Sequence, residues 1–231
     1  MKLSVIVPAF NEEKLLGTTL ASIHDAASGM DAELIVCDNN STDRTAEIAR
    51  QAGAKVVFEP VNQISRARNT GAAAASGDWL VFVDADSFPD RALFAELAEA
   101  IASGRCIGGG ATVRFDAADR FSHAAVSTWN AISRGMRWAV GSFVFCEAEA
   151  FHALGGFSTE LYASEEIDFS RRLKRLGRMT ILHRHPLRTS GRKVRLYSKA
   201  EYLKLLARVV LSGGRSLRSR DECFAWYDGR R

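Results

Sequence analysis

Residues 79–86 read Trp-Leu-Val-Phe-Val-Asp-Ala-Asp, an unbroken apolar run that ends in two aspartates around one alanine. Because every side chain from Trp79 to Val83 is apolar, both faces of the strand that it predicts must be covered. Similar runs at 3–7 and 33–37 are separated by helical patterns. Repeated units of this kind predict an α/β fold, a doubly wound, Rossmann-like sheet with helices on both faces.

The rest of the chain extends this sheet. Further strands are expected at 55–58, 108–115, 141–147 and 180–182, and further helices at 67–75 and 165–176. The long segment 119–137 interrupts the regular alternation, so the sheet is expected to be mixed. No linker and no repeat is visible. The simplest prediction is a single domain over 1–193, followed by a basic helix and tail over 194–231.

Length and composition exclude several classes. The chain has 231 residues, of which 47% are hydrophobic and 25% charged, as in globular proteins. Disordered chains, collagens and coiled coils are excluded, and no run reaches the roughly 20 apolar residues of a membrane span. The first residues do not resemble a signal peptide, so a cytoplasmic location is expected. The four cysteines are scattered without metal-ligand spacing, and no structural zinc site is expected.

Charge is unevenly distributed along the chain. Residues 187–231 hold 12 basic and 4 acidic side chains, a net charge of +8, whereas residues 1–186 carry −4. The predicted helix at 198–211 is basic and amphipathic. We expect it to pack on the body or on a second copy in a homodimer. The alternative is peripheral contact with the inner face of the membrane.

Acidic and polar residues follow three of the predicted strands, at 8–12, 38–40 and 84–86. In open α/β sheets, ligands bind beyond the carboxyl ends of the strands. A single aspartate at such a position is commonly a helix cap, but three strands that end this way favour a binding site. Asp84 and Asp86 offer the hard oxygen ligands that Mg²⁺ or Mn²⁺ prefers, often together with substrate phosphates.

Five segments of the chain resemble a known family. They are SVIVPAFNEE at 4–13, CDNNSTDRT at 37–45, ISRARNTGAAAASGDWLVFVDADS at 64–87, CEAEAFHALGGFSTEL at 146–161 and SEEIDFSRRLKRLG at 164–177. In order and spacing these segments are similar to the family 2 glycosyltransferases, which have the GT-A fold. The resemblance implies a nucleotide-sugar-binding half at 1–104 and an acceptor half at 105–193.

The resemblance also implies which residues bind a nucleotide-sugar donor. In the family, positions matching Pro8, Ala9, Asn11 and Glu12 line the nucleoside pocket, and those matching Asp38 and Arg68 contact the nucleotide. The segment Asp84-Ala85-Asp86 corresponds to the family's DXD motif, with Asp84 on the ribose and metal side and Asp86 as the direct metal ligand. Many relatives have a second aspartate where this chain has Asn39.

The catalytic base is expected at the start of the helix at 165–176. The family places this base at the second residue of an acidic pair, which is Glu166 here instead of the usual aspartate, with Glu165 as the next choice. An inverting transfer needs a carboxylate to take the proton of the acceptor hydroxyl. The neighbouring carboxylates are expected to raise one another's pKa. Alternatively, these acidic residues only stabilise the first turn of the helix.

Two further groups follow the strand expected at 180–182. Some GT-A enzymes use a histidine in this region as a metal ligand, which nominates His183 and His185, although a packed or surface histidine is the favoured interpretation. Arg192 and Lys193 resemble a family segment next to the donor and suit a diphosphate as charge-assisted donors. A solvated basic loop is the alternative for this pair.

The sequence therefore favours a metal-dependent glycosyltransferase. It would move a sugar from a nucleoside diphosphate sugar to a hydroxyl acceptor that the sequence does not identify, with inversion. A retaining GT-A enzyme would share most of the donor-side residues. A nucleotidyltransferase is a weaker alternative, because no glycine-rich phosphate loop follows the first strand. A basic nucleic-acid-binding module would suit the +8 segment, but no recognition motif is present and no nucleic acid partner is expected.

Overall fold

The computed structural model describes residues 1–116, 120–192, 201, 204, 208, 211–223 and 227. Over this part of the chain, eight strands form one sheet in the order β3-β2-β1-β4-β7-β6-β8-β5. The strands are β1 (Leu3–Ala9), β2 (Ala32–Asp38), β3 (Lys55–Phe58), β4 (Trp79–Val83), β5 (Ser87–Phe88), β6 (Gly108–Phe115), β7 (Phe143–Glu147) and β8 (Met179–Thr189).

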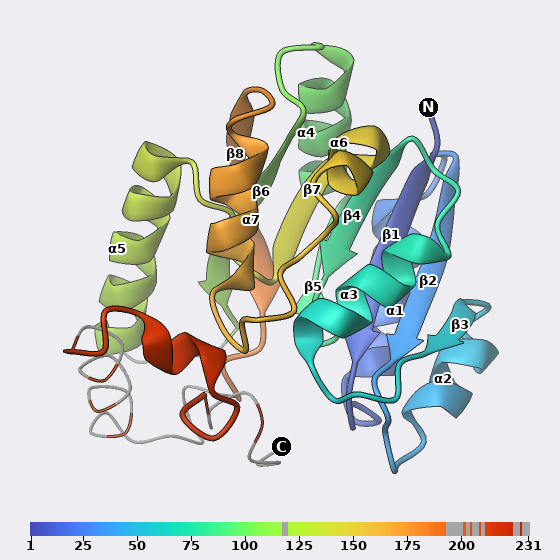
Figure 1. The fold of residues 1–231 in the computed structure, drawn as a ribbon. Coiled ribbons are helices and arrows are strands. Elements are labelled where there is room, and N and C mark those ends of the chain that lie inside the picture. The colour runs from blue at the N-terminus through green and yellow to red at the C-terminus, as the bar shows by residue number, and fades with distance from the viewer. Residues whose placement is uncertain are drawn as a thin grey trace.

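The sheet is parallel on one side and mixed on the other. Strands β3, β2, β1 and β4 run parallel, with Ile6 of β1 paired to Ile35 of β2 and to Phe82 of β4. Strand β7 runs antiparallel to β4, as the mixed sheet predicted from the sequence requires. Because β1, β2 and β4 are parallel and in register, their carboxyl ends meet at one edge, the lower end of the molecule in Figure 1.

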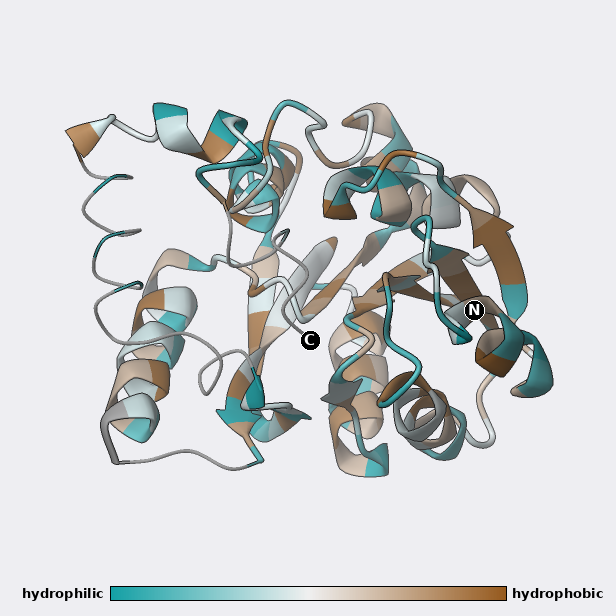
Figure 2. Cartoon of the chain, turned by 90° about the horizontal axis from the view of Figure 1, so that it is seen from below, coloured by the Kyte–Doolittle hydropathy of each residue, from teal (hydrophilic) through white to brown (hydrophobic). Residues whose placement is uncertain are grey.

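Helices cover both faces of the sheet. They are α1 (Leu16–Ala26), α2 (Thr45–Gln51), α3 (Ile64–Ala73), α4 (Arg91–Ala102), α5 (Arg120–Met136), α6 (Ala148–Ala153), α7 (Glu165–Leu173) and the 3₁₀ turn η1 (Arg215–Arg218). Successive residues of β1 point to opposite faces, so Val5 packs in the core on the side of α1 and α4, and Ile6 in the core on the side of α3 and α7. Figure 2 shows the hydrophobic strands between helices of mixed character.

The structure contains elements that the sequence analysis did not predict. They are β5, α4 and α6, and the segment that interrupts the predicted alternation contains helix α5. The last strand does not end at residue 182 but continues to Thr189, because the chain bulges at 183–186 and then rejoins β6. The buried carboxylate of Glu96 holds this bulge, since it accepts the backbone N–H groups of His183, Arg184 and His185 at 3.0–3.2 Å.

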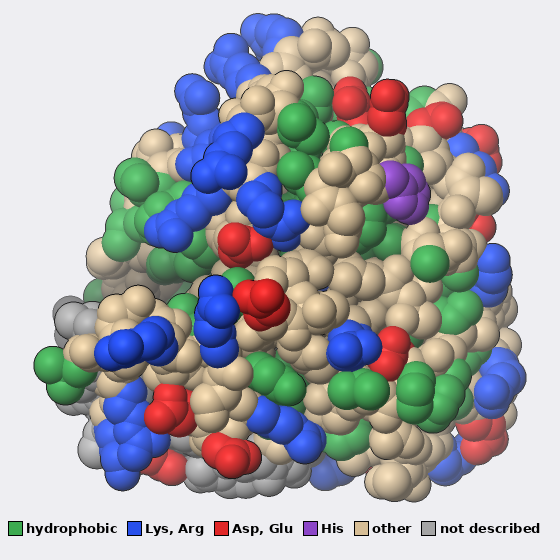
Figure 3. Space-filling view, viewed as in Figure 1, with side chains coloured by type: hydrophobic (Ala, Val, Ile, Leu, Met, Phe, Trp, Pro, Cys, Tyr) green, Lys and Arg blue, Asp and Glu red, His purple; other side chains and the backbone are tan. Residues whose placement is uncertain are grey.

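Basic residues gather at the C-terminal end of α7. Figure 3 shows Lys and Arg side chains gathered over this region. Arg171 lies over the ring of Trp138 at 4.9 Å, and the Lys174 ammonium donates to the carbonyl oxygen of Met136 at 2.9 Å. Cations here stabilise the negative end of the helix dipole, and they lie at the opposite end of α7 from its acidic first turn.

The helix predicted at 198–211 lies mostly outside the described residues, so its packing and any membrane contact stay predictions. Among the described residues, none of the helices is both long and apolar enough to cross a bilayer.

Candidate active site

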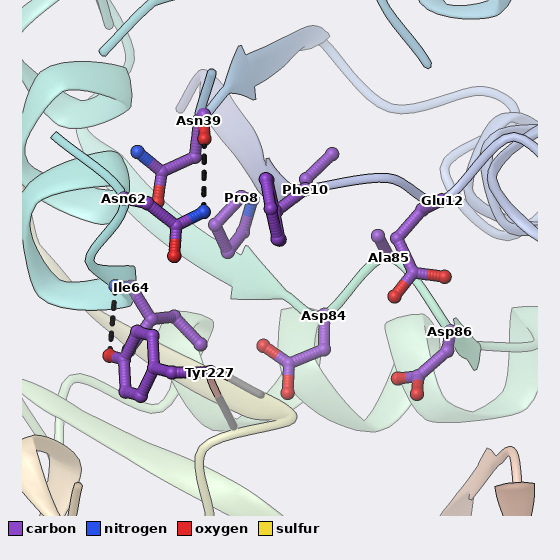
Figure 4. A pocket seen from close by; sticks show the side chains of 11 residues that line it. Pro8, Phe10, Glu12, Asn39, Asn62, Ile64, Asp84, Ala85, Asp86 and Tyr227 are labelled. Carbon is purple, nitrogen blue, oxygen red and sulfur yellow. Dashed lines mark hydrogen bonds between the residues drawn. The ribbon is translucent and has the colours of Figure 1, made fainter. Parts of the chain in front are cut away.

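A pocket opens at the carboxyl edge of the parallel strands (Figure 4). It is lined by Pro8, Ala9, Phe10, Glu12, Asn39, Asn62, Ile64, Asp84, Ala85, Asp86 and Tyr227. Figure 4 shows two chemically different ends, with Glu12 and Asp86 at one and Asn62, Ile64 and Tyr227 at the other. Six of the residues predicted from the sequence to bind the donor line this pocket: Pro8, Ala9, Glu12, Asp84, Ala85 and Asp86.

The turn after β1 places Glu12 in the pocket. Asn11 adopts a left-handed backbone conformation with φ of 51°, and its side-chain oxygen accepts the N–H of Thr42 at 2.8 Å. The N–H of Glu12 donates to the hydroxyl of Thr45 at 2.8 Å. These bonds tie the loop after β1 to the loop after β2. Asn11 therefore positions its neighbour and does not line the pocket itself.

The end of β2 contributes a different residue from the one predicted. The carboxylate of Asp38 accepts the N–H of Ser41 at 3.0 Å and is not among the lining residues, so its contact with the nucleotide stays a prediction. Asn39 lines the pocket instead. Its amide donates to the carbonyl oxygens of Glu59 and Val61, and its oxygen accepts the N–H of Gln63 at 2.9 Å. Asn39 thereby fixes the loop that carries Asn62.

Arg68 lies beneath the pocket in a buried ion-pair network. The side chain is 1% exposed. Its Nη1 lies 2.7 Å from Glu165 Oε1, and its Nη2 lies 3.0 Å from Asp84 Oδ1 and 2.7 Å from the carbonyl oxygen of Gly141. Burial alone would lower the pKa of Arg68, but the charges of Asp84 and Glu165 outweigh it and raise the pKa. Arg68 joins α3, β4 and α7, and its predicted contact with a nucleotide stays a prediction.

Glu166 lies beside this network with its side chain only partly buried. Burial, followed by the charge of Glu165, raises the pKa of Glu166 to about 8. A side chain at Gly141 would come within 3.5 Å of the Glu166 carboxyl group and 3.2 Å of Arg68, so a glycine allows the two groups to approach. Arg68 holds Glu165, neither glutamate is among the residues that line the pocket, and the role of either as a base stays a prediction.

Arg192 lies across the acidic end of the pocket. Its Nη2 is 2.8 and 3.0 Å from the two carboxylate oxygens of Glu12 and 3.6 Å from Asp86 Oδ2. Burial tends to lower the pKa of Arg192, but the hydrogen bond and charge of Glu12 raise it. Arg192 thus lies beside two acidic residues of the pocket and is not a fully solvated loop residue, but its contact with a diphosphate stays a prediction, and Lys193 lies outside the described residues.

The acidic end has the ligand chemistry for a divalent ion that is shared with a substrate. Over the described residues, no group of three or more His, Cys, Asp or Glu side chains is arranged to hold a metal ion by itself. Mg²⁺ in phosphate-binding sites needs only one or two carboxylates, because waters and phosphate oxygens complete its shell. Asp84 and Asp86 fit such an ion, and Arg192 shows that this end already attracts a cation.

The two histidines predicted as further metal ligands are not brought to this end. Their backbone N–H groups bind Glu96 in the bulge of β8, and the ring of His183 contacts the carbonyl oxygen of Ile181. Thr189, not His185, lies opposite Ser87 next to the acidic motif. Four residues of extended strand span roughly 13 Å. The bulge and the strand that follows it hold both histidines away from Asp86, and neither lines the pocket.

The fold and the pocket define a class of protein, namely an α/β protein with a ligand site at the carboxyl edge of its parallel strands. The sequence model of glycosyl transferase family 2 matches residues 4–153, and the chain belongs to this family. The resemblance noted in the sequence is thus confirmed.

Similar proteins extend the comparison. The dolichol-phosphate mannosyltransferase of Pyrococcus furiosus is 36% identical over 112 residues, which are 45% of this chain and 31% of that protein. The chain thus spans about a third of this relative's length. A mannosyltransferase of Pyrobaculum calidifontis, solved with GDP-Man and Mn²⁺, has a TM-score of 0.70 and 20% identity, covering 94% of this chain and 62% of that one.

A second solved structure is also similar. Glucosyl-3-phosphoglycerate synthase of Mycobacterium tuberculosis, in complex with Mn²⁺, UDP and glucosyl-3-phosphoglycerate, has a TM-score of 0.62 and 22% identity. The match covers 91% of this chain and 77% of that one. These similarities confirm the predicted GT-A fold.

Proposed function

We propose that this chain transfers a sugar from a nucleoside diphosphate sugar to an acceptor hydroxyl, with inversion at the anomeric carbon. Membership of glycosyl transferase family 2 supports the reaction class. The similar structures solved with GDP-Man and Mn²⁺, and with UDP and Mn²⁺, support a nucleotide-linked donor and a divalent cofactor, Mn²⁺ or Mg²⁺.

The charge balance of the site is the observation that carries the proposal. Three carboxylates line the pocket, from Glu12, Asp84 and Asp86, and that of Glu165 lies next to it in an ion pair with Arg68. Two arginines, Arg68 and Arg192, oppose them within the described part of the site. A diphosphate is repelled by such a surplus of negative charge unless a divalent cation enters with it.

The acidic residues then have separate roles. Asp84 is held by Arg68, so Asp86 is the carboxylate we assign to the metal ion, with Asp84 on its ribose side. A bound divalent ion offsets the negative charge that develops on the leaving diphosphate. Pro8, Ala9 and Ala85 shape the pocket between its two ends, and Arg192 is positioned to exchange a carboxylate partner for a phosphate oxygen.

Glu166 is the proposed general base. A base works best when its pKa lies near the working pH, and the pKa of about 8 meets this condition. The carboxylate would accept the proton of the acceptor hydroxyl as that oxygen attacks the anomeric carbon opposite the diphosphate. Glu165 and Arg68 are positioning residues for this step, since their ion pair fixes the first turn of α7.

The proposal is tested by separating binding from transfer. Parent, D86N and E166Q proteins are compared for binding of UDP and GDP with Mn²⁺ by calorimetry, and for donor turnover with a panel of nucleotide sugars. We expect D86N to lose metal-dependent nucleotide binding. E166Q should bind as the parent does and lose at least 100-fold in turnover, since general base catalysis contributes about 10²–10⁴-fold.

Controls decide between the alternatives. Glu47→Gln removes an exposed carboxylate that pairs with Arg44 and does not line the pocket, and it should change neither binding nor turnover. Full turnover by E166Q would show that the base is wrongly assigned. A product with the donor's anomeric configuration would favour a retaining enzyme. A protein that binds an oligonucleotide but none of the nucleotides tried would contradict the proposal.

A further inference from the structure

Tyr227, from the segment expected to be a basic tail, lines the pocket at the end away from Glu12 and Asp86 (Figure 4). We propose that Tyr227 is a wall of the nucleoside site, against which the nucleobase of the donor packs. The inference rests on the proposed function, because it names the residue that would recognise the nucleotide part of that donor.

Several contacts hold the ring in place. The Tyr227 hydroxyl accepts the N–H of Ile64, the first residue of α3, at 3.4 Å. The ring meets that of Tyr162 edge to face at 5.6 Å, and the Arg220 guanidinium lies 5.7 Å from its centroid. Burial, followed by the charge of Glu165, raises the pKa of Tyr227, so the ring stays neutral and its hydroxyl stays protonated.

The residues before Tyr227 are anchored to the body of the protein. The carbonyl oxygen of Leu217 accepts the N–H of Tyr162 at 2.7 Å, and Arg218 pairs with Glu160 at 3.1 Å. Arg220 donates to the side-chain oxygen of Asn62 at 3.4 Å, and Cys223 is 1% exposed. The C-terminal segment thus contacts both the loop before α7 and the loop that carries Asn62, which brings Tyr227 to the pocket.

The chemistry of this end suits a base better than a diphosphate or a sugar. Its side chains are an aromatic ring, the apolar Ile64 and the amides of Asn39 and Asn62, with Glu12 and Asp86 at the other end and Asp84 between the two ends. A ring of this kind packs against any base, because every base has a π-face. The expected loss on removing the ring is therefore about tenfold or more in affinity for uridine and guanosine nucleotides alike.

The experiment measures the binding of UDP, GDP and inorganic pyrophosphate, each with Mn²⁺, to the full-length chain. Tyr227→Ala should weaken UDP or GDP binding about tenfold and change pyrophosphate binding less than twofold. Tyr227→Phe should bind within about threefold of the parent, since it keeps the ring. If Tyr227→Ala does not fold, Tyr227→Leu takes its place in the test. Leucine keeps the apolar bulk but has no aromatic face, so it should show the losses of affinity expected for Tyr227→Ala.

Phe58→Ala is the control, because Phe58 is 57% exposed on β3 and does not line the pocket. It should leave all three affinities unchanged. An equal loss for nucleotide and pyrophosphate in Tyr227→Ala, no loss at all, or tighter binding would overturn the inference while leaving the proposed function intact. A parent protein that binds pyrophosphate but no nucleotide would overturn both.

Discussion

Replacing Glu166 with glutamine should stabilise the protein at high pH. The pKa of Glu166 is raised from an ordinary value of 4.5 to about 8, first by burial and then by the charge of Glu165. The folded state therefore holds a proton that the unfolded chain releases above pH 4.5. The stability that this group contributes is present below about pH 4.5 and is lost as the pH rises to about 8. Glutamine imitates the protonated form and has no such loss.

The magnitude follows from the two pKa values. Their difference corresponds to about 5 kcal/mol, at about 1.4 kcal/mol per pH unit. Because Glu166 keeps some contact with solvent, we expect about half of this, or about 2–3 kcal/mol, to appear as a difference in the free energy of unfolding. In a chain of this size, 1 kcal/mol shifts Tm by about 2–4 °C. E166Q should therefore melt about 5–10 °C above the parent at pH 9.

The assay is thermal unfolding of both proteins from pH 4 to pH 9 in the absence of metal and nucleotide. The two melting temperatures should coincide at pH 4, separate between pH 5 and pH 8, and run parallel above that. Glu47→Gln, which changes an exposed carboxylate, should show no such divergence. A constant difference at every pH, or a parent that is the more stable protein at pH 9, would refute the assignment of a raised pKa to Glu166.

Three further predictions concern the neighbouring charges. Glu165→Gln should destabilise the protein by about 3 kcal/mol, measured by urea unfolding, because it leaves the buried Arg68 short of one charged partner; a change below 1 kcal/mol would contradict this. The ratio kcat/KM should rise with pH toward a plateau above pH 8, following ionisation of Glu166, and a fall over pH 6–8 would exclude it as the base. Arg192→Gln should tighten the binding of Mn²⁺ alone, since Glu12 and Asp86 lose a competing cation, and should weaken the binding of a diphosphate with Mn²⁺. Paramagnetic titration of Mn²⁺ measures the first effect, and an unchanged Mn²⁺ affinity would contradict the prediction.

Much of the fold was predictable because its signals are local. The runs that became β1 and β4 are buried along their whole length between two helical layers, and β2 is buried from Ile35 to Asp38 after three exposed or half-buried residues. Strand β5 has two residues, which is too short for any periodicity to show. The extension of β8 depends on Glu96, a residue from α4 distant in sequence, which binds the backbone of the bulge. No local pattern carries that information.

The residues of the candidate site also fall into those that local sequence predicts and those that it does not. Glu12, Asp84 and Asp86 were predictable, because the ends of adjacent parallel strands must meet at one edge. Asn62, Ile64 and Tyr227 were missed. The only available signal for Asn62 and Ile64 was their position at the start of α3, where Ile64 is the first helical residue. Tyr227 reaches the pocket because the C-terminal segment docks on the loop before α7. Such docking depends on contacts between segments far apart in the chain.

The two arginines of the site differ in how deeply they are buried, and therefore in whether a ligand can compete with their carboxylate partners. Arg68 is 1% exposed and holds Asp84 and Glu165, and separating it from Glu165, which is 4% exposed, would leave buried charges without a full set of partners. It is a permanent part of the scaffold. Arg192 is 15% exposed and pairs with Glu12 and Asp86, where water and incoming ligands can compete for it. If a divalent cation binds at Asp86 as proposed, we expect it to weaken the ion pair with Arg192 and so to leave the guanidinium available to a phosphate. On this proposal we expect metal and diphosphate binding to be coupled through Arg192, so that each raises the affinity for the other by the same factor.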